Sequence, residues 1–267
     1  MTHEIRLYAV LGSPIAHSLS PRLHNFAFQQ RRMSWCYYVP VMCQPHQLLE
    51  KLEAFRSLGG VGVNLTRPLK ETVLPYLARR SRWVEATGAA NTLAWTDSGW
   101  VGDNTDVQAL LGRLPAAKPS GAPALVLGSG GAARSSVVAL RMLGYEPTVA
   151  ARRPEAVDFC PTVIPWAALS EPHPWAVVIN ATPLGQSGEA SFDRWPAWAT
   201  GTVAVDWVYQ PRQTAFLTQA ASAGCRVVDG LALLVDQARY AWVSWFGEMG
   251  PASMIEAVAE RASDDAG

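Results

Sequence analysis

Short runs of apolar residues alternate with helix-like segments along the whole chain. In the first hundred residues, strands are predicted where apolar residues run together: 7–11, 35–41 and 61–65, with a hairpin from 91–95 and 100–101. Helices are predicted between them over about 21–31, 45–57 and from Pro68 onward. Ser20 before Pro21 has the pattern of an N-cap followed by proline at the first helical position.

The alternation restarts after residues 115–123, which form the clearest loop of the chain. The strands predicted beyond this loop are 124–127, 148–151, 175–180 and 202–206. The helices predicted in this half are 106–114, 131–143, 230–246 and a last one from Pro251. Strands that alternate with helices predict an α/β protein with mainly parallel sheets, and we divide it near residues 105 and 230.

Composition narrows the range of functions. Hydrophobic residues make up 49% of the 267 residues and charged residues 16%, which suits two domains with sizeable cores. The formal net charge is zero, so no global field favours nucleic acid or an anionic membrane. No apolar stretch is long enough to span a membrane, and the first residues do not resemble a secretion signal, so we expect a cytoplasmic protein.

Cysteine and tryptophan usage adds two expectations. The four cysteines form no C-x-x-C pair and no cluster with zinc spacing, so we expect no metal site and reduced thiols. The eleven tryptophans are interpreted first as filling for cores and domain interfaces. Because they would also suit an interface between copies of the chain, a homodimer is kept as an option.

A glycine-rich turn, Gly128-Ser129-Gly130-Gly131-Ala132-Ala133, lies between a predicted strand and a predicted helix. In this setting Gly128 permits a tight turn, Gly130 lets the backbone approach a pyrophosphate, and the small Ala133 lets helix and strand pack closely. Amides at the helix N-terminus then face the phosphate charge. The turn predicts a Rossmann-like dinucleotide site, and an ordinary glycine-rich loop is the alternative.

The next strand ends where such a site reads the adenosine ribose. A carboxylate there would bind the ribose 2′-hydroxyl, but this chain has Ala151, Arg152 and Arg153. Guanidinium groups bind phosphate through paired donors, so we expect NADP (NADPH) rather than NAD. The alternative is a solvated turn that happens to be basic.

Three polar motifs precede this half of the chain. Ser18 and Ser20 alternate around Leu19 beside a helix N-terminus, a suitable place for a carboxylate, although helix capping would account for Ser20 alone. Lys70 falls in the first turn of the helix from Pro68, where the helix dipole disfavours a cation; a surface lysine is the alternative. Asp106 near the start of another helix is favoured as an anion that could steady Lys70, or it is a simple cap.

Together these motifs resemble the shikimate dehydrogenase family, and they occur in the same order over nearly the whole chain. The matching segments are Gly-x-Pro-x-x-His-Ser-x-Ser-Pro-x-x-His-Asn at 12–25, Asn-x-Thr-x-Pro-x-Lys at 64–70, Gly-Ala-x-Asn-Thr at 88–92, Asn-Thr-Asp at 104–106, the turn at 128–133, Asn-Ala-Thr-Pro-Leu-Gly at 180–185, Asp-x-Val-Tyr-x-Pro at 206–211 and Asp-Gly-x-x-x-Leu-x-x-Gln at 229–237.

The resemblance implies an enzyme that reversibly reduces 3-dehydroshikimate to shikimate with NADPH in aromatic amino-acid biosynthesis. It implies a substrate domain over 1–105, completed by 230–267 that returns to it, an NADP domain over 106–229, and an active site in the cleft between them. Lys70 and Asp106 are the implied catalytic pair. The implied substrate residues are Ser18, Ser20 and Tyr209 for the carboxylate and Asn64, Thr66, Asn91 and Gln237 for the rest of the molecule. The implied cofactor residues are Gly128, Ser129, Gly130, Gly131, Ala132, Ala151, Arg152, Arg153, Thr182, Trp207 and Gly230.

The chain departs from the family pattern at a few cofactor-side positions. Ala151-Arg152-Arg153 replaces a common Asn-Arg-Thr, Ala232-Leu233 replaces Gly-Met, and Trp207 is bulkier than usual. A quinate/shikimate or aminoshikimate dehydrogenase shares nearly all of these motifs and is the nearest alternative. A non-catalytic NADP-binding sensor is the alternative from another class, and it predicts binding without turnover.

Overall fold

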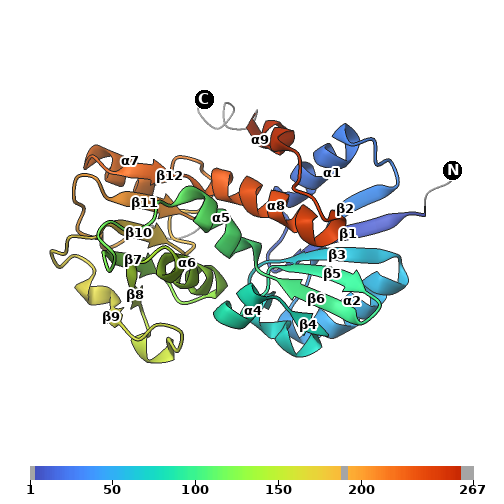
Figure 1. Ribbon diagram of the computed structural model, residues 1–267, viewed down its shortest axis with the longest axis horizontal. Coiled ribbons are helices and arrows are strands. Elements are labelled where there is room, and N and C mark those ends of the chain that lie inside the picture. Colours follow the sequence, from blue (N-terminus) through green and yellow to red (C-terminus); the bar gives the residue numbers. More distant parts are fainter. Residues whose placement is uncertain (1–3, 188–191, 260–267) are drawn as a thin grey trace. The chain divides into compact units, whose positions relative to one another are not determined.

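The computed structural model describes residues 4–187 and 192–259. The chain divides into two compact units, one made of residues 1–105 and 235–267 and the other of residues 106–234, within those described ranges. Each unit contains one six-stranded sheet and the helices that connect its strands. The prediction of an α/β protein from the sequence is confirmed. Figure 1 shows the two sheets and their helices in sequence colours.

The first unit contains a six-stranded sheet in the order β2-β1-β3-β5-β6-β4. Its strands are β1 (Arg6–Gly12), β2 (Cys36–Met42), β3 (Gly60–Leu65), β4 (Arg79–Arg80), β5 (Thr92–Thr96) and β6 (Gly99–Asp103). Strands β1, β2 and β3 are parallel, so their carboxyl ends share one edge, and antiparallel β5 begins at that same edge. The helices that follow these strands are α1 (Ser20–Gln30), α2 (Leu48–Ser57), α3 (Leu69–Thr72) and α4 (Arg82–Thr87).

The C-terminal helices pack on the first unit. Helix α8 (Gly230–Phe246) enters this unit at Val235, and α9 (Glu256–Ala259) lies beside α1 in Figure 1. Trp242 donates from its indole nitrogen to Nδ1 of the buried His24 over 3.1 Å, and Trp245 donates to the Leu93 carbonyl over 2.9 Å. The expectation that the tail returns to the first domain is therefore confirmed, and these two tryptophans hold it there.

The outer edge of β2 is blocked by the chain itself. Asn25 accepts a hydrogen bond from the Tyr38 amide over 2.9 Å and donates to the Tyr38 carbonyl over 2.8 Å. The Cys36 amide donates to Met33, and Pro40 has no amide hydrogen. The backbone amides and carbonyls of alternate residues point to the same side of a strand. The backbone groups of Cys36, Tyr38 and Pro40 therefore all lie on the side of β2 that faces away from β1. The edge therefore offers little to another strand.

The second unit contains a six-stranded parallel sheet in the order β12-β11-β10-β7-β8-β9. Its strands are β7 (Pro123–Leu127), β8 (Glu146–Ala151), β9 (Val163–Pro165), β10 (Val177–Asn180), β11 (Val203–Asp206) and β12 (Arg226–Val228). Counted from the first strand of the unit, this is the doubly wound order 3-2-1-4-5-6 of dinucleotide-binding folds. The expected Rossmann-like unit is confirmed, and its topological switch point lies between β7 and β10.

Helices α5 (Thr105–Arg113), α6 (Gly131–Met142) and α7 (Ala215–Ser222) complete the second unit. The chain passes from one unit to the other inside two helices, α5 at Thr105 and α8 at Leu234. No helix in the described ranges 4–187 and 192–259 is long and apolar enough to cross a membrane.

Candidate active site

The loops after β1 and β3 are held against each other at the carboxyl edge of the first sheet. The Ser13 amide donates to the Arg67 carbonyl over 2.9 Å, and the Thr66 amide donates to the Leu11 carbonyl over 2.9 Å. A Cβ atom at Gly12 would lie 2.2 Å from Thr66 and 2.9 Å from the Arg67 carbonyl oxygen, so only glycine allows this approach. The Ser-x-Ser loop and the loop that leads to Lys70 are therefore brought together.

The prediction that Ser20 caps a helix is wrong. Helix α1 begins at Ser20 itself, its N-cap is Leu19, and no side chain bonds to the cap position. Instead the Ser18 hydroxyl accepts from the Ser20 amide over 3.3 Å. Ser18 is half-buried and Ser20 is buried, and α1 has no acidic residue in its first turn. Both hydroxyls thus lie at a helix N-terminus that suits an anion.

Behind these loops a buried network of polar side chains joins strands and helices that are far apart in the sequence. The Tyr38 hydroxyl donates to Asn64 over 2.8 Å, and the Asn64 amide nitrogen donates to the Asn91 carbonyl over 3.2 Å and to Thr92 Oγ1 over 3.0 Å. Both amide hydrogens of Asn64 are used inside the protein, so a contact with substrate, which stays a prediction, would have to be made through Oδ1. Burial raises the pKa of Tyr38 well above its usual range, so it remains a donor.

The network continues to two of the residues predicted to hold substrate hydroxyls. Asn91 accepts from the Thr105 amide over 2.8 Å and donates from its amide nitrogen to Thr105 Oγ1 over 3.0 Å. Thr105 in turn donates to Gln237 Oε1 on α8 over 3.5 Å. Both amide side chains are buried, so hydrogen bonds rather than solvent fix their orientation.

Lys70 lies half-buried on the one-turn helix α3, and its carbonyl accepts from the Ala90 amide over 2.8 Å. Lys70 lies in the first turn after Pro68 as expected, but this helix is only four residues long, so its dipole is small. Asp106 is 3% exposed in the first turn of α5. Lys70 belongs to the first unit and Asp106 to the second, and their pairing stays a prediction.

In the second unit, the glycine turn fits a phosphate group. Gly128 has a φ of 109°, and its Cβ would lie 2.9 Å from the Ala181 carbonyl oxygen, so the turn passes directly over the switch point. Gly130 is the N-cap of the 12-residue helix α6, which has no side-chain cap and no acidic residue in its first turn. A Cβ at Gly130 would meet nothing within 4 Å. This open space in front of helix amides suits the pyrophosphate of a dinucleotide.

The strand next to the turn carries the basic pair. Strand β8 ends at the buried Ala151, and Arg152 and Arg153 follow it with exposed side chains. The Asp158 carboxylate farther along this loop pairs with Arg134 of α6 over 2.7 Å. This ion pair ties the basic loop to the helix that begins at the glycine turn.

A buried aspartate, to which the sequence analysis assigns no role, organises the loops after β10 and β11. Asp206 accepts from Asn180 over 2.9 Å, from the Val208 amide over 2.9 Å and from Thr214 over 2.6 Å. Asn180 also accepts from the Thr182 hydroxyl over 2.6 Å. Desolvation raises the pKa of Asp206 to about 6. The signal in the sequence that could have predicted this role is the position of Asp206 at a strand end, inside the Asp-x-Val-Tyr-x-Pro motif.

This organised loop carries two more of the expected residues. The Trp207 indole nitrogen donates to Ser136 of α6 over 3.1 Å, which holds the ring on the helix of the glycine turn. Tyr209 is half-buried in the same loop and belongs to the second unit, unlike Ser18 and Ser20. A Cβ at Gly230 would lie 2.3 Å from the Val208 carbonyl oxygen, so α8 can begin there only with glycine.

One unit is a parallel doubly wound sheet with an open glycine turn at a helix N-terminus. The other is an α/β unit with buried amides and a lysine at the carboxyl edge of its sheet. Together these features indicate a dinucleotide-dependent oxidoreductase. Comparison with known proteins gives the family. The family model described as "Shikimate dehydrogenase substrate binding domain" matches residues 10–93. The chain belongs to the shikimate dehydrogenase family.

Relatives extend the match over both units. The shikimate dehydrogenase (NADP(+)) of Pelobacter propionicus is 36% identical over 264 residues, which cover 94% of this chain and 95% of that protein. The enzyme of the same name from Acidiphilium cryptum is 38% identical over 259 residues and 92% of each chain. The crystal structure of shikimate 5-dehydrogenase from Thermus thermophilus in complex with NADP(H) and shikimate has a TM-score of 0.81 and 34% identity, covering 97% of this chain and 100% of that one.

Proposed function

We propose that this chain is an NADP-dependent shikimate dehydrogenase, which reversibly reduces 3-dehydroshikimate to shikimate in aromatic amino-acid biosynthesis. The observation that carries the proposal is the match to enzymes of this name over at least 92% of both chains. The reaction requires a carboxylate site, hydroxyl-binding groups, a proton donor and a hydride donor.

The substrate carboxylate would be bound by Ser18 and Ser20, whose hydroxyls lie at the N-terminus of α1. Tyr209 would add a third hydroxyl. The ring hydroxyls would be bound by Thr66, Asn91 and Gln237. Since Asn91 and Gln237 are held by Thr105, they can discriminate a hydroxyl from a hydrogen at little cost in side-chain entropy.

Lys70 would supply the proton to the ketone oxygen as it becomes an alkoxide, and would take the proton back in the oxidation of shikimate. Asp106 would hold the Lys70 ammonium and one substrate hydroxyl in position. Bound NADPH supplies the hydride. The residues that would hold it are Gly128, Ser129, Gly130, Gly131, Ala132, Ala151, Arg152, Arg153, Thr182, Trp207 and Gly230.

Steady-state kinetics test the proposal directly. We expect reduction of NADP by shikimate, with a much lower kcat/KM for quinate and for NAD in place of NADP. Preference for quinate would replace the substrate assignment, and preference for NAD would remove the role of Arg152 and Arg153. Tight NADP binding without turnover on any of these substrates would identify the sensor instead.

The cofactor preference has a matched control. Replacing Arg152 and Arg153 by leucine should raise the KM for NADPH and leave the KM for NADH nearly unchanged, because only NADPH carries the 2′-phosphate. The exposed Arg79 on β4 is the control position in the other unit. An equal effect on both cofactors would contradict a phosphate contact.

Cellular location and assembly are also proposed rather than measured. We place the enzyme in the cytoplasm with its small-molecule substrate, without nucleic-acid or membrane partners and without a metal ion. A homodimer remains the assembly to test by light scattering during size-exclusion chromatography. A homodimer joined through the outer edge of β2 is disfavoured by the hydrogen bonds that Asn25 makes there.

A further inference from the structure

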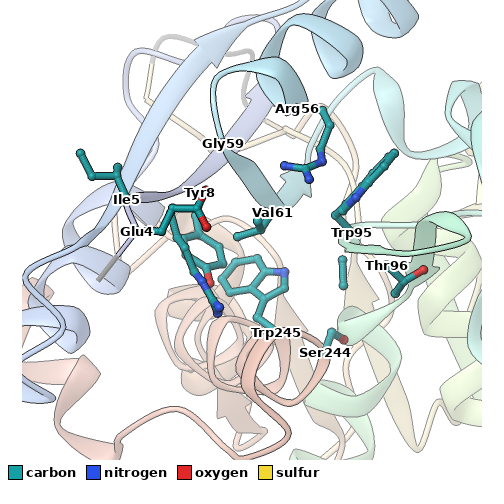
Figure 2. Close-up of a pocket in the computed structure, with 12 residues that line it drawn as sticks. Glu4, Ile5, Tyr8, Arg56, Gly59, Val61, Trp95, Thr96, Ser244 and Trp245 are labelled. Atoms are coloured by element: carbon teal, nitrogen blue, oxygen red, sulfur yellow. The ribbon is translucent and has the colours of Figure 1, made fainter. Parts of the chain in front are cut away.

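A pocket of about 300 Å³ opens in the first unit at the edge of the sheet opposite to Ser18 and Lys70. Strands β1 and β3 begin at this edge, and antiparallel β5 ends there, whereas the candidate active-site loops follow the other ends of β1 and β3. We call it the amino-edge pocket and define it by Arg6, Tyr8, Arg56, Val61, Trp95 and Trp245, with Glu4 at its rim (Figure 2). All of these described lining residues belong to the first unit.

The first feature of the amino-edge pocket is the Arg56 guanidinium, which forms no ion pair with any residue in 4–187 or 192–259. Arg56 is half-buried, and its Cζ atom lies 5.0 Å from the centre of the Trp95 ring. Stacking on an indole leaves the N–H donors in the plane of the guanidinium available. In the described part of the chain, no carboxylate or carbonyl oxygen accepts from Arg56. A partly desolvated cation of this kind is stabilised by an anion.

The second feature of the amino-edge pocket is its positive charge together with the flat apolar surfaces of two indole rings. Arg6 adds a second positive charge, and Glu4 contributes the one carboxylate among the described residues that line the pocket. Figure 2 shows the Arg56 guanidinium directed into the pocket beside Trp95, with the Trp245 indole below it. The Trp245 N–H is already used by the Leu93 carbonyl, so this indole offers its flat apolar surface. Trp95 is 37% exposed, which is considerable for an indole.

We propose that the amino-edge pocket binds a small aromatic carboxylate. The carboxylate would pair with Arg56, assisted by Arg6, because a guanidinium fork matches the two oxygens of a carboxylate. The ring would pack on the Trp95 and Trp245 indoles, where aromatic contacts add to the area buried. The volume is at the lower end of small-molecule sites and suits one or two fused rings.

The test compares two probes on the intact protein by isothermal titration calorimetry. Indole-3-carboxylate should bind with a dissociation constant on the order of 0.1–1 mM, and indole-3-methanol, which lacks the charge, at least about tenfold more weakly. Saturating shikimate should leave both affinities unchanged, because the pocket is at the opposite edge of the sheet. The measurement needs no turnover, so it is independent of the proposed dehydrogenase activity.

Variants then locate the site. Arg56→Met should weaken indole-3-carboxylate binding about 10- to 100-fold and leave indole-3-methanol unaffected. Arg79→Met removes an exposed arginine of the same unit outside the pocket and should change neither affinity. Equal affinity of the two probes, displacement by shikimate, or equal losses in both variants would overturn the proposal. The probe comparison on the unmodified protein decides the question even if Arg56→Met fails to fold.

Discussion

Replacing each of two glycines in the turn after β7 by alanine should separate folding from cofactor binding. At Gly128 the backbone φ is 109°, and the new Cβ would lie 2.9 Å from the Ala181 carbonyl oxygen and 3.1 Å from Thr182 Cγ2. At Gly130 the φ is −90° and the ψ −171°, an extended conformation open to any residue, and the Cβ would meet nothing within 4 Å. One substitution therefore strains the apoprotein, and the other fills only the space in front of α6.

The two costs follow from this geometry. Gly128→Ala pays about 1–3 kcal/mol for the left-handed backbone and a similar amount for overpacking, so we expect a loss of roughly 2–5 kcal/mol. In Gly130→Ala, a poorer N-cap costs about 0.5–1 kcal/mol, and reduced freedom of the unfolded chain offsets it by about 0.4–1 kcal/mol. Its stability should stay within about 0.5 kcal/mol of the parent, while its Cβ displaces the pyrophosphate and raises the KM for NADPH at least about tenfold.

Thermal unfolding without cofactor and steady-state kinetics measure the two effects separately. The unfolding midpoint should fall by roughly 5–15 °C for Gly128→Ala and by no more than about 2 °C for Gly130→Ala. The kcat of Gly130→Ala at saturating NADPH should remain close to the parent value. Comparable destabilisation by both substitutions, or an unchanged KM for NADPH in Gly130→Ala, would refute the assignment of this open space to the pyrophosphate.

Three other substitutions test the buried Asp206 carboxyl, the proposed role of Lys70 as proton donor, and the protected edge of β2. Burial raises the pKa of Asp206 from 3.8 to about 6, so the folded protein binds this proton more tightly than the unfolded chain does. The resulting contribution to the free energy of unfolding is complete below pH 3.8 and is lost as the pH rises through 6. As the pH rises from about 4 to about 7, the free energy of unfolding of Asp206→Asn, measured with urea, should increase by about 3 kcal/mol relative to that of the parent. A difference between variant and parent that does not change with pH would contradict the raised pKa. Lys70→Ala should lower kcat about 100- to 10,000-fold with shikimate binding retained, as measured by turnover and by calorimetry; near-normal turnover removes Lys70 from the mechanism. Asn25→Ala should cost about 1–3 kcal/mol and cause concentration-dependent association in sedimentation velocity, because the Tyr38 amide and carbonyl lose their partner; a stable monodisperse variant would argue against edge protection.

The sequence predicted the central strands well. Of the edge strands it predicted β2, as 35–41, and missed β4, β9 and β12. The apolar runs at 7–11 and 61–65 correspond to Arg6–Gly12 and Gly60–Leu65, because a central parallel strand is buried on both faces. Edge strand β4 consists of two exposed arginines and has no apolar signal to detect. The helix expected from Pro68 ends at Thr72, and Pro75 follows in the next turn, where it cannot continue the α-helical hydrogen bonds.

Serine and threonine residues at helix starts are unreliable signals in this chain. Ser20 was predicted as a cap, yet the helix begins one residue earlier than such a cap would allow. Ser81 and Thr214 do cap α4 and α7 by accepting from the Val84 and Leu217 amides, although neither helix was predicted. Serine and threonine are common in turns as well as at caps, so a cap residue without a clear apolar stripe after it is weak evidence.

The two halves of the candidate site differ in how far the sequence can reveal them, and the reason is physical. The cofactor half depends on backbone conformation, which contiguous glycines and a following helix determine locally, so a six-residue motif is enough to predict it. The substrate half depends on side chains such as Tyr38, Thr105 and Gln237, which meet only after three parallel strands and a returning helix have assembled. Spacing along the chain carries no trace of those contacts. Residues that touch the substrate can therefore be proposed from family motifs, whereas the residues that hold them in place require the structure.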